Sequence, residues 1–302
     1  MELRQLETFV SVLTNRSFTR AANDLSLTQP AVTRQIAALE RELKTRLLER
    51  MGRRVAPTQA GEALLTYALE ILRLASEADR AVRDIATGGA GKLAVGASST
   101  TAAYILPRLL SAFRARTPGV EISVHTGPSA QVALMVMANE VDLGVVTSPG
   151  ARTGLSEIPL AEFATCVVVY PGHPLSSRNT ADRCLTAEEL AGNPLILMEE
   201  GTNLRTYVDR LLSAAGVQER VTMELDNVEA IKKMIEARLG ISLLPRIAVK
   251  GEVEAGSLIA LPLEDAPGSR RTISLIHRTD KYVTSAMAAL MELIIDSFTA
   301  GR

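Results

Sequence analysis

The chain has 302 residues, of which 47% are hydrophobic and 22% are charged, and its formal net charge is −1. This composition excludes an intrinsically disordered chain, and the length predicts two or three folded units. The near-neutral total excludes a uniformly basic nucleic-acid-binding protein. The two cysteines, Cys166 and Cys184, lie in no CxxC motif, which argues against a disulfide framework and a zinc site.

Positive charge is concentrated near the N-terminus. Residues 1–58 contain ten basic and six acidic residues, a net charge of +4, so the remainder of the chain carries −5. A basic segment joined to an acidic remainder fits a nucleic-acid-binding domain with a separate partner domain. Chance unevenness of charge is the alternative.

The first residues, MELRQLETFV, lack the basic segment and apolar run of a signal peptide. No apolar run approaches the ~18 residues needed to span a bilayer. We therefore expect a soluble cytoplasmic protein without membrane contact.

Residues Phe18–Leu39 predict a helix-turn-helix. Apolar residues at helical spacing between Leu3 and Leu13 predict a preceding helix. Ser17 is a favourable N-cap for the second helix, where two adjacent alanines allow another helix to cross closely. Thr28 is expected to cap the third helix, whose first turn tolerates a proline.

The third helix has two distinct faces. We expect a buried apolar stripe made of Val32, Ile36, Leu39 and Leu43. The residues expected to bind DNA lie on the opposite face: Gln29, Pro30, Thr33 and Arg34. Gln can bind adenine through two hydrogen bonds, Thr can contact base or phosphate, and Arg can bind guanine or phosphate. An ordinary amphipathic helix with a polar outer face is the alternative.

The next segment, LLERMGRRVAPT, predicts a β-hairpin wing. Leu47–Leu48 and Val55 are typical of strands, with Met51–Gly52 as the turn between them. Three arginines near the tip are expected to contact the minor groove or phosphates: Arg50, Arg53 and Arg54. A solvated charge cluster is the alternative.

Residues 59–87 predict one long helix. Leu64, Ile71, Ala78 and Ile85 recur every seven residues, a heptad seam about 40 Å long that favours pairing with a second chain. Packing against its own C-terminal domain is the alternative. A dimer would present two DNA-binding units to half-sites about 34 Å apart. Residues 88–91, three of them glycines, predict a hinge.

After the hinge, strands alternate with helices, which predicts a parallel α/β sheet. The predicted strands are Lys92–Ala97, Val120–Thr126, Leu143–Val146, Thr165–Tyr170, Leu195–Met198, Val221–Leu225, Ile241–Leu244 and Thr272–His277. The predicted helices are Ile105–Ala115, Gln131–Ala138, Leu204–Ala215, Glu229–Arg238 and Ser285–Phe298. The last strand and helix return to the first half, which gives two lobes with crossovers near Leu160 and Glu264.

Polar side chains follow five of the predicted strands. Ligands of such sheets bind beyond the carboxyl ends of strands, where hydroxyl groups and helix N-termini favour anions. The residues expected to bind a small molecule there are Ser98, Ser99, Thr100, Ser129, Thr147, Thr202, Asn203 and Asn227. Each could instead be an ordinary N-cap, and it is their shared position at one edge of the sheet that favours a pocket.

Three runs in the first part of the chain, LETFV, FTRAANDLSLTQPAVTRQIAALE and RRVAPTQAGEALL, resemble the LysR-type transcriptional regulators. The C-terminal half resembles the effector-binding domain of that family through GKLAVGASSTTAAYILPRLLSAF, VDLGVV and NVEAIKKMIEARLGISLLP. This resemblance implies a winged helix-turn-helix at 1–58, a linker and dimerisation helix at 59–87 and a hinge at 88–91. It also implies a two-lobed, periplasmic-binding-protein-like α/β effector domain at 92–302, with lobe I at 92–160 and 265–302 and lobe II at 161–264.

By the same resemblance, the effector is a small organic acid, an amino acid or a similar metabolite bound between the lobes. Several family members that bind dicarboxylates carry an arginine at the end of the third strand, where this chain has Val146–Thr147. Among the predicted strand ends only Arg205 offers a cation. The sequence therefore favours a neutral, zwitterionic or singly negative effector over a dianion.

The motifs of common enzyme families, such as GxSxG, HExxH and the P-loop, do not occur, so the sequence predicts neither catalysis nor a metal or cofactor. A solute-binding module would leave the DNA-facing residues unexplained, and an architectural DNA-binding protein would leave the polar strand ends unexplained. We therefore expect a transcriptional regulator that binds double-stranded promoter DNA and a small effector. The resemblance implies a homodimer, commonly a homotetramer, with RNA polymerase as a further candidate partner.

Overall fold

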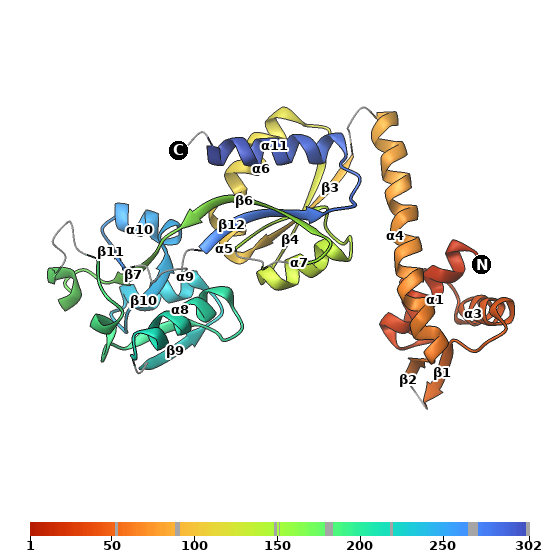
Figure 1. Cartoon of the computed structure of the whole chain (residues 1–302), viewed down its shortest axis with the longest axis horizontal. Coiled ribbons are helices and arrows are strands. Elements are labelled where there is room, and N and C mark those ends of the chain that lie inside the picture. The colour runs from red at the N-terminus through yellow and green to blue at the C-terminus, as the bar shows by residue number, and fades with distance from the viewer. Residues whose placement is uncertain are drawn as a thin grey trace. The chain divides into compact units, whose positions relative to one another are not determined.

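The computed structural model describes residues 1–51, 54–87, 91–147, 150, 152–178, 184–217, 220–264 and 271–299. The chain divides into two compact units, Met1–Ala86 and Thr87–Arg302, each of which folds around its own core (Figure 1). No helix in the described ranges is long and apolar enough to cross a membrane.

Three helices form the core of the first unit: α1 (Leu3–Asn15), α2 (Phe18–Asp24) and α3 (Gln29–Leu43). Their apolar faces meet in one cluster that excludes water almost completely. Ser17 caps α2 as expected, because its hydroxyl accepts a hydrogen bond from the Arg20 amide at 3.3 Å. Thr28 occupies the N-cap position of α3 with an extended backbone, but its side chain makes no capping hydrogen bond.

The predicted wing is present as a two-stranded antiparallel hairpin, β1 (Leu48–Met51) and β2 (Arg54–Pro57). Met51 pairs with Arg54 and so belongs to a strand and not to the turn. A second detail of the prediction is wrong: Leu43 is 39% exposed, because α3 ends there and Lys44 turns the backbone into the left-handed region. The buried stripe of α3 therefore ends at Leu39.

The long helix α4 (Gln59–Thr87) follows the wing directly. The Thr58 hydroxyl accepts a hydrogen bond from the Gly61 amide at 3.0 Å and donates one to the carbonyl of Arg46 at 2.8 Å. Gly61 lies so close to the chain before the wing that an added Cβ would stand 2.1 Å from the Leu47 carbonyl oxygen. This close crossing joins the helix to the hairpin.

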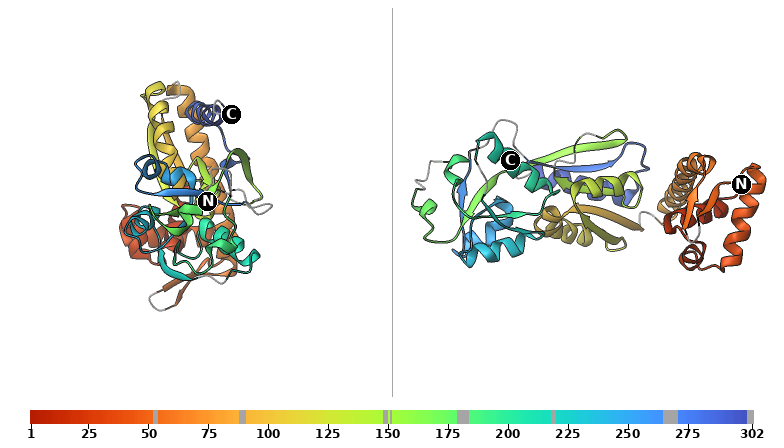
Figure 2. Two further views of the ribbon diagram at one scale, coloured as in Figure 1. Left: turned by 90° about the vertical axis from the view of Figure 1, so that its left-hand side faces the viewer. Right: turned by 90° about the horizontal axis from the view of Figure 1, so that it is seen from below.

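The second unit contains a five-stranded sheet in the order β4-β3-β5-β12-β6. Its strands are β3 (Lys92–Ser98), β4 (Glu121–Gly127), β5 (Leu143–Thr147), β6 (Leu155–Phe163) and β12 (Arg271–Arg278). The helices α6 (Leu106–Arg116) and α11 (Ser285–Thr299) cover one face, and α7 (Ser129–Met137) covers the other (Figures 1 and 2). The short helix α5 (Ser99–Tyr104) follows β3. We call this part lobe I.

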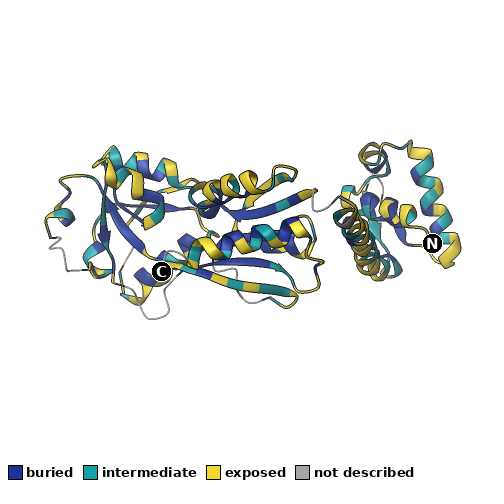
Figure 3. Ribbon diagram, turned by 90° about the horizontal axis from the view of Figure 1, so that it is seen from above, coloured by how far each residue is buried: buried dark blue, intermediate teal, exposed yellow. Residues whose placement is uncertain are grey.

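The rest of the unit, lobe II, contains a three-stranded sheet and a two-stranded sheet. Their strands are β7 (Thr165–Val169), β8 (Leu195–Met198), β9 (Val221–Leu225), β10 (Ser242–Pro245) and β11 (Ile259–Pro262), with helices α8 (Asn203–Ala214), α9 (Val228–Glu236) and α10 (Lys250–Glu254). Three 3-10 helices complete the lobe at Pro174–Arg178, Glu188–Leu190 and Arg246–Val249. Buried residues run along the strands of both lobes (Figure 3).

The prediction of a parallel sheet is correct for only part of the second unit. Strands β3, β4 and β5 are parallel, as are β8 and β9, but β12 runs antiparallel to both of its neighbours and β7 runs antiparallel to β10 and β11. The cause is the chain path: β12 enters lobe I from lobe II and so starts at the edge where the parallel strands end. Strand β6 was not predicted, and it remains paired with β12 as far as Phe163, so the proposed boundary after residue 160 falls inside a strand.

Substitution of Gly61 by alanine tests the crossing of α4 over the wing. The new methyl group would collide with backbone that cannot move independently, so we expect Gly61→Ala to lower the free energy of unfolding by about 1–3 kcal/mol. Chemical denaturation of the full chain measures this change.

Gly251→Ala in α10 is the matched control, because an added Cβ there meets nothing within 4 Å. The same exchange should be neutral or stabilise by up to about 1 kcal/mol through helix propensity. Equal stability of the Gly61→Ala variant and the unmodified protein would contradict the described crossing.

Candidate functional site

The N-terminal turn of α3 presents the polar face that the sequence predicted. Gln29, Pro30 and Arg34 are exposed and Thr33 is half-buried, with its hydroxyl donating a hydrogen bond to the Gln29 carbonyl at 3.0 Å. The buried side of the same helix holds Val32 in the core. The core thus orients the helix so that these four side chains lie on one accessible surface.

The wing is attached to α3 by a contact that the sequence analysis missed. The Glu40 carboxylate, from the last turn of α3, accepts hydrogen bonds from the amides of Leu47 at 2.8 Å and Leu48 at 3.2 Å. Arg50 and Arg54 belong to the paired strands, but their side chains lie outside the described part of the structure, as does Arg53 entirely.

Helix α4 keeps part of its apolar seam exposed. Tyr67, Leu74 and Val82 have relative exposures of 66%, 51% and 67%. Large apolar side chains at heptad-related positions on one exposed helix are typical of a surface that another helix covers.

In lobe I, three parallel strands end side by side, because Ser98 pairs with Gly127 and the neighbouring strand ends at Thr147. Ser98 and Ser129 are buried and hydrogen-bonded inside the lobe. The Ser98 hydroxyl lies 3.0 Å from that of Thr101, and the Ser129 hydroxyl accepts a hydrogen bond from the Thr147 amide at 3.3 Å. Ser99 is exposed and Thr100 half-buried at the start of α5.

In lobe II, two predicted residues do act as N-caps. The Thr202 hydroxyl accepts a hydrogen bond from the Arg205 amide at 3.2 Å, and the Asn227 side chain accepts one from the Glu229 amide at 2.7 Å. Thr202 and Asn203 are half-buried and Asn227 is exposed. Capping uses one acceptor of each residue and leaves room for further hydrogen bonds.

The five strand ends do not share one sheet edge, which corrects the sequence interpretation. Strands β3, β4 and β5 belong to lobe I, whereas β8 and β9 form a separate two-stranded sheet in lobe II. The two groups nevertheless meet, because the Asn203 amide donates a hydrogen bond of 2.7 Å to the Thr147 carbonyl oxygen across the lobes. Thus the structure brings Ser129, Thr147 and Asn203 into one hydrogen-bonded series.

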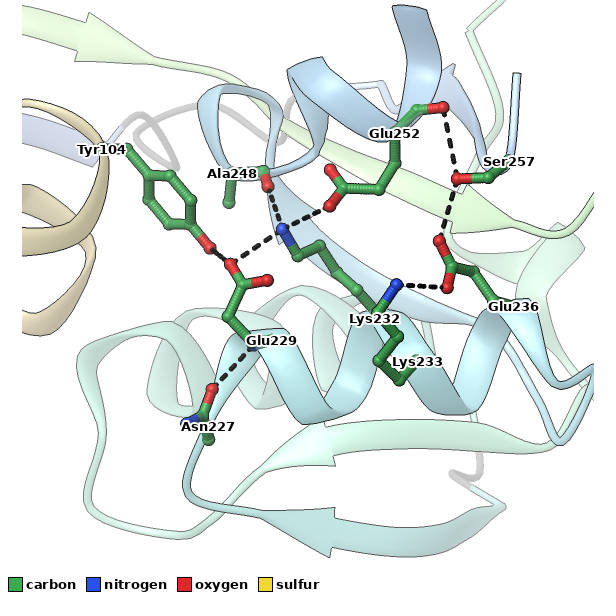
Figure 4. Close-up of polar contacts among 9 residues, drawn as sticks. All are labelled: Tyr104, Asn227, Glu229, Lys232, Lys233, Glu236, Ala248, Glu252 and Ser257. Atoms are coloured by element: carbon green, nitrogen blue, oxygen red, sulfur yellow. Dashed lines mark hydrogen bonds and ion pairs between the residues drawn. The ribbon is translucent and has the colours of Figure 1, made fainter. Parts of the chain in front are cut away.

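A second polar bridge joins the lobes and was not predicted. The Tyr104 hydroxyl of α5 donates a hydrogen bond to the Glu229 carboxylate of α9 (Figure 4). Glu229 also forms an ion pair of 2.8 Å with the buried Lys232 ammonium, which contacts Glu252 at 2.7 Å and the Ala248 carbonyl at 3.0 Å. The Lys232 ammonium lies 5.4 Å from the centroid of the Tyr104 ring. Sequence spacing could suggest only the pair between Glu229 and Lys232.

The charges of this bridge stabilise one another. Burial by itself would raise the pKa of Glu229, but hydrogen bonds from Lys232 and Tyr104 outweigh it and lower the pKa. Burial likewise acts to lower the pKa of Lys232, and the contacts with Glu229 and Glu252 raise it. The pKa of Tyr104 is raised by burial and by Glu229. The bridge is therefore an ionised pair with a neutral tyrosine at neutral pH.

Arg205, the cation that the sequence placed near the pocket, is already neutralised. Its guanidinium contacts Asp209 at 2.6 Å, Glu224 at 2.7 Å and the Met198 carbonyl at 3.1 Å. Only 7% of its side chain is exposed. It therefore fixes α8 to the neighbouring strands.

A cavity of about 460 Å³ lies elsewhere, between α6 and α11, and none of the predicted effector-binding residues lines it. Its walls include Arg108 and Arg116, with an apolar floor that includes Leu109 and Phe163.

Two family models match the chain. That of the bacterial regulatory helix-turn-helix protein, lysR family, matches residues 3–62, and that of the LysR substrate binding domain matches residues 86–299.

Similar proteins have the same arrangement over their full length. A probable RuBisCO transcriptional regulator of Trichormus variabilis is 33% identical, over 98% of this chain and 88% of that protein. The crystal structure of full-length CbnR complexed with its target DNA is 26% identical, with a TM-score of 0.64, and covers 98% of this chain and 100% of that one.

The regulatory domain of CcmR from Synechocystis, solved in complex with 2-PG, is 25% identical with a TM-score of 0.62. It covers 69% of this chain and 97% of its own. Together with the two family models, which match both units, these similarities establish what kind of protein this is. The chain belongs to the LysR family of transcriptional regulators, which are DNA-binding proteins with an effector-binding domain and not enzymes.

Proposed function

We propose that α3 enters the major groove of promoter DNA and that Gln29, Pro30, Thr33 and Arg34 contact it there. The observation that carries this proposal is the accessible polar face of α3 on a helix whose other side is fixed in the core. The similar CbnR protein has been solved with its target DNA. Arginine and glutamine bind base edges through two hydrogen bonds, and threonine binds base or phosphate.

The wing extends this contact. Arg50 and Arg54 belong to a hairpin that Glu40 holds against the recognition helix, and Arg53 adjoins Arg54 in the sequence. Positive side chains there bind phosphates or a narrow minor groove, which fixes the position of α3 on the duplex.

The proposed active unit is a homodimer formed through α4, and two dimers form a tetramer. Support comes from the exposed apolar residues Tyr67, Leu74 and Val82, which a second helix would cover. Such a dimer acts on DNA in the cytoplasm and offers RNA polymerase a surface at the promoter.

The effector is proposed to be a small organic acid, an amino acid or a similar metabolite. It binds where the lobes meet, within reach of Ser99, Thr100, Thr202, Asn203 and Asn227. Ser98, Ser129 and Thr147 form the buried support behind them. The contact from Asn203 to Thr147 supports this location, because it brings the strand ends of both lobes together.

The effector controls transcription by favouring one arrangement of the lobes over another. A ligand shifts such an equilibrium only through a difference in affinity between the two arrangements. A ligand at the border between the lobes meets that condition, because every change in their relative position changes its contacts.

Arg34→Ala tests the proposed DNA contact. Loss of a charged hydrogen bond to base or phosphate should weaken operator binding by roughly 1–3 kcal/mol, or about 5- to 150-fold in Kd. Gel-shift titrations on operator and random DNA at several salt concentrations measure the effect. They also separate a specific regulator from an architectural protein, which would show little preference for the operator.

Arg114→Ala is the matched control, because this arginine is exposed and belongs to the second unit, whereas the proposed DNA-binding face belongs to the first. It should leave operator affinity unchanged. Unaltered affinity in Arg34→Ala would remove Arg34 from the interface.

Ser99→Ala and Thr202→Val test the effector site. Both should impair the response of a reporter promoter to the effector without weakening DNA binding, because they remove hydroxyl groups only from the second unit. Thr206→Val, one turn along α8, removes an exposed hydroxyl and serves as the control. A normal effector response in both test variants would exclude the proposed pocket.

A further inference from the structure

Arg271 is the first residue of β12 and lies at the edge of lobe I that faces the proposed effector site. Strand β12 runs antiparallel to β5, and Ile273 pairs with Thr147, the last residue of β5. Arg271 therefore lies two residues, or about 7 Å, beyond the end of β5. Its other strand neighbour is Phe163, the last residue of β6. The hydroxyl-bearing Tyr207, from α8 of lobe II, lies near enough to act on it electrostatically.

The side chain of Arg271 is buried and still charged. The residue is only 8% exposed. Burial lowers the pKa of its guanidinium to about 10, while Tyr207 acts in the opposite direction. A pKa near 10 leaves the group protonated at neutral pH, so the protein holds a positive charge where water cannot solvate it well.

Other buried cations in the described part of the chain show how this protein normally balances such a charge. Arg205 contacts two carboxylates, Lys232 contacts two carboxylates, and Lys281 lies 2.8 Å from Asp142. Among the described residues, no carboxylate forms an ion pair with Arg271. A buried ion without a partner destabilises a fold, and the three paired examples show that the chain otherwise supplies one.

We propose that Arg271 is the counter-ion for the effector, and that the effector is therefore a small oxyanion whose carboxylate or phosphate group binds this guanidinium. This inference rests on the proposed effector site and assigns its ligand a charge.

The geometry suits such a ligand. A planar guanidinium donates two parallel hydrogen bonds to a carboxylate or phosphate group, which a lysine cannot reproduce. Hydroxyl and amide groups at Thr202 and Asn203 would then bind the polar remainder of the molecule from the start of α8, the helix that also carries Tyr207.

Thermal unfolding of the full chain tests the inference, with sodium acetate, sodium succinate and sodium phosphate as probes. Sodium chloride at matched ionic strength is the reference. The variants are Arg271→Gln, Arg271→Lys and, as control, Arg114→Gln.

At least one probe should raise the Tm of the unmodified protein and of Arg114→Gln, by an amount that grows with the logarithm of probe concentration. The shift should disappear in Arg271→Gln and be reduced in Arg271→Lys. A Tm shift with acetate or succinate but not with phosphate identifies a carboxylate as the preferred group, and a shift with phosphate alone identifies a phosphate.

Without any probe, Arg271→Gln should have a higher Tm than the unmodified protein, because it removes a buried charge with which no carboxylate of the described residues forms an ion pair. A structural arginine would give the opposite result. A lower Tm in Arg271→Gln, a probe-induced shift that persists in it, or no shift with any of the three anions would overturn the inference.

Two further variants separate this inference from the proposed function. An anion-induced shift that needs Arg271 but is normal in Ser99→Ala and Thr202→Val would support the counter-ion and move the site away from the proposed residues. Conversely, an effector response that is lost in those two variants and normal in Arg271→Gln would retain the proposed site and overturn the role of Arg271.

Discussion

The hydrogen bond from the Asn203 amide to the Thr147 carbonyl joins two lobes that have largely separate hydrophobic cores. Ile247 alone among the residues of lobe II packs against the apolar cluster of lobe I in the described structure. Because apolar burial contributes little across the border, polar contacts decide how the lobes are arranged. A ligand bound at this border would add to these polar contacts or compete with them.

The second polar bridge has a different character. Glu229 is shared between the Tyr104 hydroxyl of lobe I and the buried Lys232 of lobe II (Figure 4). The ion pair is complete within lobe II, since Lys232 also contacts Glu252. Separation of the lobes would therefore break only the tyrosine hydrogen bond and leave no buried charge unpaired. Such a contact can open at small cost, which suits a domain that responds to a ligand.

In the first unit, by contrast, apolar packing joins all the elements. Its helices, wing and α4 share one apolar cluster, and Glu40 and Thr58 add hydrogen bonds between successive elements. A DNA-reading surface needs this rigidity, because the side chains that contact base edges must keep a fixed position relative to those on the backbone.

Sequence reasoning succeeded where the signal was local. The faces of α3, the hairpin and most strands of the second unit follow from apolar periodicity and turn residues, which act within a few positions of one another. It failed at Leu43, where a left-handed C-cap ends the helix, and at β6, which has no clean alternation of apolar residues. Polar strand ends and their capping function were recognised from local sequence, but the bridge from Asn203 to Thr147 depends on a residue far away in the chain.

The order of residues alone determined the family, the two units and the polar surface of α3, because these depend on short-range patterns and recurring motifs. Only the tertiary structure decided that the strand ends of the two lobes meet through Asn203 and Thr147, that Arg205 is neutralised and that no described carboxylate pairs with Arg271. The sequence did not predict Arg271 as a site residue because the polar residues singled out all follow the carboxyl ends of strands. Strand β12 is antiparallel to β5, so its first residue, Arg271, lies at the same edge of the sheet. Whether a buried charge has a partner depends on the fold, because that partner can be close in the sequence, as Asp209 is to Arg205, or far away, as Asp142 is from Lys281.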